Sequence, residues 1–332
     1  MEQKLYLGNC IELINSMEDK SINLVVSSPP YNIGKSYEKK ISLTDYLAVQ
    51  TELLERICTK LTDDGSIFWQ VGSFTSNGCV TPLDVKFFQI FENLGMFPIN
   101  RIIWIRQHGL QAKNKFSCRH ETILWFAKSM NYKFNLDNIR VPQKYKNKKY
   151  YKGDSKGQPS CHPDGKNPGD VWAFGNVKHN HEEQTIHPCQ FPEDMVARII
   201  LATTEEGDVV FDPYMGTGTV AVVARDCNRR FLGAELDEKY FDVAQRRLKG
   251  EPDENGFFPN LKTLRDYVER TGEPINNYRY DLQKGVKTTE RGKSKINSEY
   301  ENMESTLYRL EKEEYSKKLS SVNHLEPIIV EQ

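Results

Sequence analysis

Four consecutive residues, Ser28-Pro29-Pro30-Tyr31, place a hydroxyl, two prolines and a phenol directly after an apolar run. Proline has no N–H and a fixed φ, and it drives the preceding residue toward extended geometry. The stretch is therefore expected to form a stiff turn whose carbonyl groups stay out of helix and sheet pairing. Such a turn predicts rigid oxygen acceptors that face a ligand beside an aromatic ring.

A second chemical motif, DPYMGTGT, spans residues 212–219. Asp212 ends the apolar run VVFD, and Gly216 and Gly218 form a tight turn that opens a helix. Glycines let a ligand approach the backbone, and a helix N-terminus offers unpaired N–H groups. Glu235 ends the next apolar run, where a carboxylate can accept hydrogen bonds from ribose hydroxyls. GxxxxGK[ST] and the third glycine of GxGxxG are both missing, so the arrangement indicates an adenosine-containing cofactor rather than a P-loop.

The elements that must position these motifs alternate along the chain. Short β-rich runs predict strands at 21–28, 65–72, 101–107, 121–129, 208–212 and 230–236. Helical spacing with start and stop signals predicts helices at 42–65, 86–95, 192–207, 218–228 and 237–250. The expected fold is a doubly wound, mostly parallel α/β sheet. Periodicity fails over 128–180, where only GDVWAF resembles a fixed element, and the polar chain past Gly250 predicts an amphipathic helix at 296–319.

Charge is distributed unevenly along the 332 residues, although the net charge is only −1. Residues 101–160 hold fourteen Lys or Arg and three acidic residues, a local balance of +11, so the rest of the chain carries −12. A solvated loop is the common interpretation of such a run. Tyrosines and asparagines interleave this one, which favours contact with a polyanion.

Composition also indicates the cellular compartment of the protein. No apolar run approaches the ~20 residues of a membrane span, and the N-terminus does not resemble a signal peptide. The seven cysteines are scattered without a CxxC pair, as is typical of free thiols in a reducing compartment. The spacing of the His and Cys residues over 161–189 matches no standard zinc site, so no metal is predicted. The expected location is cytoplasmic, away from membranes.

Taken together, SSPPYN and FDPYMGTGT resemble the S-adenosyl-L-methionine-dependent DNA methyltransferases that methylate exocyclic amino groups. The resemblance covers roughly residues 4 to 248. LGNCIELINSMEDKSINLVVSSPPYNIG resembles the catalytic segment of this family, RHETILWFAKS a late core strand, and HPCQFPEDMVARII the cofactor-side helix. A catalytic motif that precedes the cofactor motif is the order of the β class, found in bacterial restriction–modification systems. The resemblance implies a Rossmann-like sheet with an antiparallel strand.

The resemblance also implies roles for individual residues. Ser28 and the Pro29 carbonyl would accept hydrogen bonds from the amino group of a flipped-out base, with Pro30 stiffening the turn and Tyr31 stacking on the base. Asn9 stands where the family commonly has an acidic residue, and an amide can still bond an adenine edge. The implied cofactor-binding residues are Asp212, Pro213, Tyr214, Gly216, Gly218, Thr219, Glu235, Asn9, His187 and Phe191.

Two target bases, cytosine and adenine, are left open. A serine in the first position of the tetrapeptide is typical of cytosine-N4 enzymes and an aspartate of adenine-N6 enzymes, with exceptions. Ser28 therefore favours cytosine N4, and adenine N6 is the alternative. Within the basic insertion, the side chains predicted to contact the DNA backbone are those of Arg140, Lys144, Lys146, Lys148 and Lys149.

These interpretations divide the chain into four parts. The catalytic half is 1–127, and the target-recognition insertion is 128–180. The cofactor-binding half is 181–250, and the polar extension is 251–332. The implied partner is double-stranded DNA, and a cognate restriction endonuclease would be a functional rather than a physical partner. A homodimer is left open. An RNA methyltransferase and an inactive DNA-binding relative are the more distant alternatives, although the latter would be expected to lose Ser28–Tyr31 or Asp212.

Overall fold

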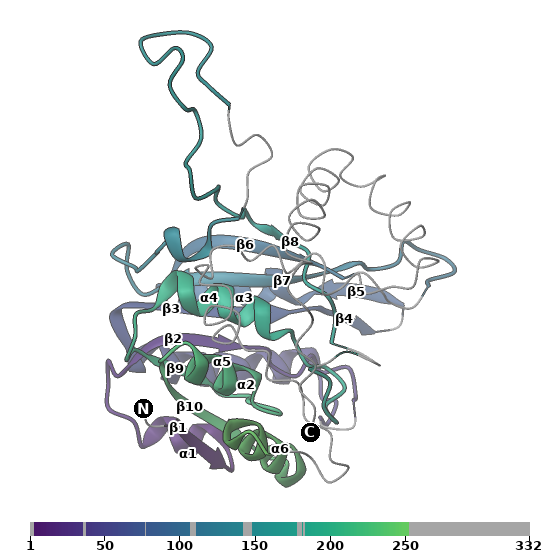
Figure 1. Cartoon of the computed structure of the whole chain (residues 1–332). Coiled ribbons are helices and arrows are strands. Elements are labelled where there is room, and N and C mark those ends of the chain that lie inside the picture. Colours follow the sequence, from purple (N-terminus) through teal and green to yellow (C-terminus); the bar gives the residue numbers. More distant parts are fainter. Residues whose placement is uncertain are drawn as a thin grey trace, which may run out of the picture.

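The protein folds as one mixed sheet with helices on both faces (Figure 1). The structure, a computed structural model, describes residues 3–35, 38–76, 78–106, 111–141, 148–177, 181 and 183–251. Lys144, Lys146 and the helix predicted at 296–319 lie outside the described residues. None of the helices in the described ranges has the length and apolar character that a membrane span requires.

Strands and helices alternate in the first and last parts of the chain, as the sequence predicts, whereas residues 61–82 and 97–127 hold consecutive strands. In chain order they are β1 (Gln3–Leu7), α1 (Cys10–Asn15), β2 (Ile22–Ser27), α2 (Leu43–Lys60), β3 (Leu61–Val71), β4 (Ser73–Ser76), β5 (Cys79–Pro82), α3 (Leu83–Asn93), β6 (Phe97–Ile105), β7 (His120–Ala127), the 3₁₀ turn η1 (Asp137–Ile139), β8 (Val171–Trp172), α4 (Glu193–Thr203), β9 (Val209–Asp212), α5 (Thr219–Asp226), β10 (Arg230–Glu235) and α6 (Glu238–Lys249).

The strand order places the two halves of the chain side by side. The main sheet runs β1-β10-β9-β2-β3-β7-β6-β8, with β7 antiparallel to both of its neighbours and every other pair parallel. From the central pair, β2 leads on to β3 and β9 leads on to β10, so the strand order diverges between them. A point where the order diverges in this way is where open α/β sheets form their binding crevice.

Alternate side chains of β2 explain why its sequence is an unbroken apolar run. Leu24 and Val26 lie in one core cluster with buried residues of α4 and α5, whereas Val25 lies in a second cluster with residues of α2 and α3. Side chains of a strand point alternately to opposite faces, and both faces of this strand are covered by helices. All three residues are buried.

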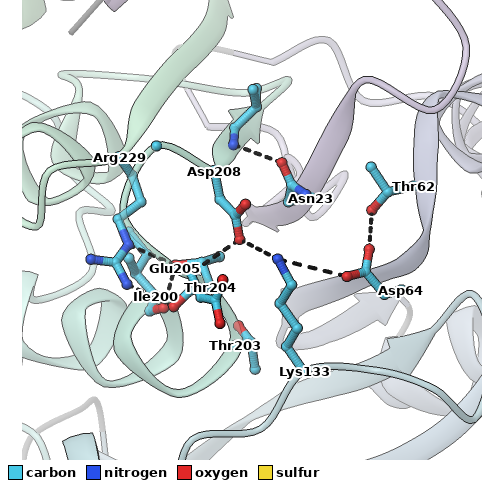
Figure 2. A network of polar contacts seen from close by, with 12 residues as sticks. Asn23, Thr62, Asp64, Lys133, Ile200, Thr203, Thr204, Glu205, Asp208 and Arg229 are labelled. Carbon is cyan, nitrogen blue, oxygen red and sulfur yellow. Dashed lines mark hydrogen bonds and ion pairs between the residues drawn. The ribbon is translucent and has the colours of Figure 1, made fainter.

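A network of polar contacts joins the amino ends of the central strands (Figure 2). Lys133 Nζ lies 2.8 Å from Asp208 Oδ2 and 3.6 Å from Asp64 Oδ2. The backbone N–H of Val209, at the start of β9, donates to Asn23 Oδ1 of β2 at 2.9 Å. These contacts connect Lys133 and the start of β9 to β2 and β3, on the edge of the sheet opposite to the two chemical motifs.

β1 and α1 were not among the elements predicted from periodicity, and two further features differ from the expected elements. The helix predicted at 42–65 ends at Lys60, because the next residue, Leu61, is buried and pairs with Ile22 in the sheet. The β4–β5 hairpin was not predicted. Its strands have four residues each, too short for periodicity to reveal them.

The predicted loop-rich insertion contributes both to the core and to a projection. Trp172 and Phe174 are buried in the core cluster that contains α4 and α5. Two isolated bridges pair Val141 with Lys166 and Lys149 with Pro159. The described residues 148–166 extend away from the sheet beyond β6 and β8 (Figure 1). The division of the chain into four parts stays a prediction.

Candidate active site

Both chemical motifs lie at the carboxyl ends of the central strands and line one cavity of about 1590 Å³. Ser28 follows β2, Asp212 ends β9 and Glu235 ends β10. The Ser27 hydroxyl donates to Asp212 Oδ1 at 2.6 Å and joins segments that lie 185 residues apart in the sequence. The fold therefore brings the serine–proline turn and the glycine turn into one site at the divergence point of the sheet.

The serine–proline turn presents two oxygen atoms at the cavity wall. Ser28 is half-buried, Pro29 is buried, and both line the cavity. In the described part of the chain, no donor reaches the Pro29 carbonyl. An acceptor that has no donor within the chain is available to a ligand.

Tyr31 belongs to a polar cluster within the same cavity. Its hydroxyl lies 3.2 Å from Ser28 Oγ and donates to Glu121 Oε2 at 3.1 Å. Arg106 Nη1 lies 2.9 Å from Glu121 Oε1, and Gln70 Nε2 donates to Glu121 Oε2. Burial, and then the charge of Glu121, raise the pKa of the Tyr31 phenol well above its usual value. The phenol is thus a protonated donor at neutral pH.

Two contacts from neighbouring elements fix the turn. The hydroxyl of Tyr46, on α2, donates to the Pro30 carbonyl at 2.7 Å. Gly72, directly after β3, lies against the Tyr31 ring so closely that a Cβ there would approach Tyr31 Cε2 to 2.8 Å. The position of the turn is therefore set by packing from α2 and β3 as well as by its own prolines.

Asp212 organises the start of the glycine turn from a buried position. Its side chain is 1% exposed, and Oδ1 accepts both from Ser27 and from the Tyr214 backbone N–H at 3.0 Å. Burial raises the pKa of Asp212 to about 7, although both hydrogen bonds act in the opposite direction. The Tyr214 hydroxyl in turn accepts from Gln50 Nε2 at 2.7 Å.

Different structural features explain the two glycines of the turn. Gly218 has a φ of 78°, and a Cβ there would lie 2.8 Å from the Cβ of Ala244, so α6 packs directly on the backbone. Gly216 has a φ of 55°, and its N–H donates to Glu235 Oε2 at 2.8 Å. A Cβ at Gly216 would meet nothing nearer than the His187 ring at 3.8 Å, so this backbone faces open space in the cavity.

Glu235 and His187 complete the wall near the turn. Glu235 Oε1 accepts from the Asp237 N–H at 2.9 Å, so both of its oxygens bond the backbone, and burial raises its pKa. His187 Nδ1 accepts from the Cys189 N–H at 3.2 Å. Burial lowers the pKa of His187 to about 4, so the ring is neutral at pH 7 and Nε2 carries its proton. The ring also stands edge-on to Tyr240, with centroids 4.7 Å apart.

The remaining predicted cofactor residues also line the cavity, except Gly218. Asn9 caps α1, because its Oδ1 accepts from the Ile11 N–H at 3.0 Å, and its amide nitrogen is left for a ligand. Pro213, Thr219 and Phe191 are on the wall. Gly218 lies beneath the turn against α6, and its role in binding the cofactor stays a prediction.

The predicted DNA-contacting residues lie elsewhere. Arg140 is engaged within the fold, since its Nε lies 2.6 Å from Asp137 Oδ1 and its Nη1 donates to the Gly165 carbonyl at 3.1 Å. Lys148 and Lys149 are exposed and do not line the cavity. The basic residues at the cavity are different ones, namely Lys35, Arg106, Lys115 and Arg119. Each of the three described positions stays a prediction as a DNA contact.

Sequence reasoning missed the polar cluster beside Tyr31. Gln70 and Glu121 lie within runs that predict buried strands, and Arg106 belongs to a third such run. A polar or charged side chain inside a buried strand needs a partner, and this signal was available for Glu121, one of only three acidic residues over 101–160. Pairing between β3, β6 and β7 brings the three together, and no sequence pattern states that register.

Comparison with known proteins now assigns the family. The profile of the DNA methylase family N6_N4_Mtase matches residues 22–246. This chain belongs to that family. It is 58% identical to the type II methyltransferase M.BglII of Bacillus subtilis over 270 residues, which cover 81% of this chain and 75% of that protein. The chain is therefore an S-adenosyl-L-methionine-dependent DNA methyltransferase of a type II restriction–modification system.

Solved structures share the fold of this methyltransferase. The cytosine-N4-specific PvuII DNA methyltransferase matches with a TM-score of 0.59 at 20% identity, over 76% of this chain and 94% of that chain. The protein TTHA0409 of Thermus thermophilus, in complex with S-adenosyl-L-methionine, matches with a TM-score of 0.54 at 22% identity, over 74% and 93% of the two chains. The predicted methyltransferase-like sheet, mostly parallel with an antiparallel strand, is confirmed.

Proposed function

We propose that this methyltransferase acts on the N4 amino group of a cytosine that has left the DNA duplex. The observation that carries the proposal is the pair of acceptors on the serine–proline turn, the Ser28 hydroxyl and the Pro29 carbonyl, beside the glycine turn. An exocyclic amino group has two hydrogens to donate. Two fixed acceptors match it, and the Ser27–Asp212 hydrogen bond supports their placement next to the cofactor turn.

The methyl group has to be transferred to an amino nitrogen that is a poor nucleophile, because its lone pair is delocalised into the ring. Bound S-adenosyl-L-methionine supplies an electrophilic methyl group on a sulfonium. Ser28 and the Pro29 carbonyl hold the two amino hydrogens and favour a nearly tetrahedral nitrogen, with its lone pair aimed out of the base plane. Pro30 keeps these acceptors in place before the reaction, so little reorganisation is needed. Tyr31 stacks on the base.

The cofactor half would hold S-adenosyl-L-methionine from several sides. Open space over Gly216, the buried carboxyl of Asp212 and the half-buried carboxyl of Glu235 fit a cationic, adenosine-bearing molecule. The amide nitrogen of Asn9 and the Nε2–H of His187 are donors at the same wall. Phe191, Pro213, Tyr214 and Thr219 supply the remaining surface.

Ser28 supports cytosine as the target, since the residue types of the tetrapeptide resemble those of cytosine-N4 enzymes. Adenine N6 is the alternative, because a hydroxyl and a carbonyl would accept from its amino group equally well. The cavity volume of about 1590 Å³ admits either base. Nucleoside identity therefore has to be measured.

Basic side chains of the cavity support duplex DNA as the partner. Lys35, Lys115 and Arg119 are among the lining residues, and the side chain of Phe116 is fully exposed. Basic groups contact phosphates and an aromatic ring can stack on an unpaired base. Methylation at this site would protect the host sequence from a cognate endonuclease, which needs no physical contact with this chain.

The experiment is nucleoside analysis by mass spectrometry of DNA methylated by the purified protein. N4-methylcytosine is the expected product. N6-methyladenine would overturn the assignment of the base while leaving the two-acceptor mechanism in place. The affinity of the protein for DNA, measured at increasing salt concentrations, should fall steeply if several phosphates are contacted.

A further inference from the structure

A chain of hydrogen bonds runs from a carboxylate to the hydroxyl that faces the target base. Glu121 Oε2 lies 3.1 Å from the Tyr31 hydroxyl, and that hydroxyl lies 3.2 Å from Ser28 Oγ. In the second contact either oxygen could be the donor. The surroundings of Glu121 decide the direction.

Glu121 is surrounded by donors. A guanidinium nitrogen of Arg106 lies 2.9 Å from Oε1, and the amide nitrogen of Gln70 and the phenol of Tyr31 both donate to Oε2. An ionised carboxylate has acceptor positions only, and this set of neighbours matches it. Glu121 therefore accepts in its contact with Tyr31 and cannot donate.

Tyr31 has a single proton, and Glu121 takes it as an acceptor. The oxygen of Tyr31 then has only lone pairs to offer Ser28, so Ser28 must be the donor in the 3.2 Å contact. The opposite direction would place the lone pairs of Tyr31 and Glu121 against each other at 3.1 Å. The hydroxyl hydrogen of Ser28 thus points toward Tyr31 and away from the base.

We infer that Glu121 is a positioning residue, which acts through Tyr31 to make Ser28 an acceptor-only group. A freely rotating hydroxyl would present its hydrogen to the amino group in part of the population, and two donors do not bond. The inference rests on the proposed role of Ser28 and deepens it. Acceptor-only polarity fits the amino groups of cytosine and adenine and rejects the carbonyl oxygens that thymine and guanine present instead.

The direct test is Glu121→Gln, because a glutamine amide can donate to Tyr31 and so reverse the direction of both contacts. The single-turnover rate of methyl transfer should fall by about tenfold to a hundredfold, the range for a hydrogen bond to a charged group. Calorimetric affinity for S-adenosyl-L-methionine should not change. Glu12→Gln is the matched control, since Glu12 accepts from the Tyr6 hydroxyl at 2.6 Å outside the cavity.

A second substitution separates positioning from general support of the fold. Aspartate at position 28 is acceptor-only by itself and needs no help from Glu121. In the Ser28→Asp background, Glu121→Gln should therefore cost no more than about twofold in rate. An equal loss in the wild-type and Ser28→Asp backgrounds would overturn the inference.

If Ser28→Asp has no measurable activity, the effect of Glu121→Gln is measured in the Ser28→Ala background instead. Without a hydroxyl at position 28 there is no direction to set, so adding Glu121→Gln should leave the residual rate within about twofold. A further tenfold loss would contradict the relay. Full activity of Ser28→Ala alone would instead refute the proposed role of Ser28, so the two failures give different results.

Discussion

The two edges of the central sheet use polar groups in opposite ways. At the amino ends of β2, β3, β9 and β10, polar side chains bond one another and nearby backbone groups. Arg229 shows this best, because its Nε donates to Thr204 Oγ1 at 2.9 Å and its Nη2 to the Thr204 carbonyl at 2.6 Å (Figure 2). Lys133 likewise lies between Asp208 and Asp64.

At the carboxyl ends of the same strands, bonding within the chain is left incomplete. The Pro29 carbonyl has no donor from the described residues, and both Ser28 and Pro29 line the cavity. Asp212 is buried at a cost that its raised pKa records. The amino edge thus holds the strands together, whereas the carboxyl edge keeps acceptors ready for a ligand. Substitutions on the two edges should therefore have different consequences.

The largest effect is expected at Asp212. Replacing it with alanine removes the acceptor shared by Ser27 and the Tyr214 N–H. Two hydrogen bonds to a charged group are worth about 3 kcal/mol together, so affinity for S-adenosyl-L-methionine should fall by about a hundredfold or more. Calorimetry measures the affinity, and Asp212→Asn, which keeps an oxygen at the same place, is the control. Unchanged affinity in folded Asp212→Ala would contradict the site.

A large loss of stability is expected at Arg247, which supports the glycine turn from α6. Its side chain is 1% exposed, with Nη2 at 2.7 Å from Glu193 Oε1 and Nη1 donating to the Thr217 carbonyl at 2.6 Å. Arg247→Met leaves a buried carboxylate without this partner and should lower the free energy of unfolding by about 3 kcal/mol. Urea denaturation measures it. Arg246→Met is the neighbouring control, and equal losses in both variants would refute the supporting role.

The sequence predicted the elements around these residues better than their contacts. Apolar runs located the strands that carry Ser28, Asp212 and Glu235, because a buried strand must be apolar on both faces. Proline and glycine located the two turns, since their backbone constraints are local. Their meeting was predicted from a family resemblance rather than from the residues alone.

What escaped prediction depends on long-range pairing. Gln70, Arg106 and Glu121 come from three strands whose register is fixed only in the folded sheet. Arg140 looked like a free cation in the sequence, but Asp137 and the Gly165 carbonyl engage its guanidinium. Its partners follow from the way the insertion folds back, with Val141 bridged to Lys166.

A moderate effect is expected from pH. The pKa of Asp212 is raised to about 7 in the folded chain, so between about pH 4 and pH 7 the folded state holds a proton that the unfolded carboxyl has released. Stability from this group is therefore greatest in acid and is lost as pH rises toward 7, by up to about 1.4 kcal/mol per pH unit. His187, whose pKa is lowered to about 4, acts in the opposite direction, with stability lost as pH falls.

Asp212→Asn isolates the carboxyl, because His187 is present in both proteins. Urea denaturation at about pH 5, 6 and 7 should show the difference in unfolding free energy between wild type and variant changing steadily with pH. Parallel stability profiles would mean that Asp212 keeps an ordinary pKa in the folded chain.

The smallest effect is expected on the amino edge. Lys133→Met removes a half-buried partner of Asp208 and should lower the free energy of unfolding by about 1 kcal/mol. The rate of methyl transfer should stay at the wild-type value, because this network lies on the opposite edge of the sheet from the cavity. A loss of rate without a loss of stability would break the distinction between the two edges.

The most direct test of the carboxyl-edge site is the single-turnover rate of Ser28→Ala, measured with its calorimetric affinity for S-adenosyl-L-methionine. An acceptor at the reacting amino group should matter for transfer and not for cofactor binding. We predict unchanged affinity and a rate lower by about a hundredfold, the usual cost of losing one hydrogen-bonding group aimed at the transition state. A wild-type rate would contradict the account.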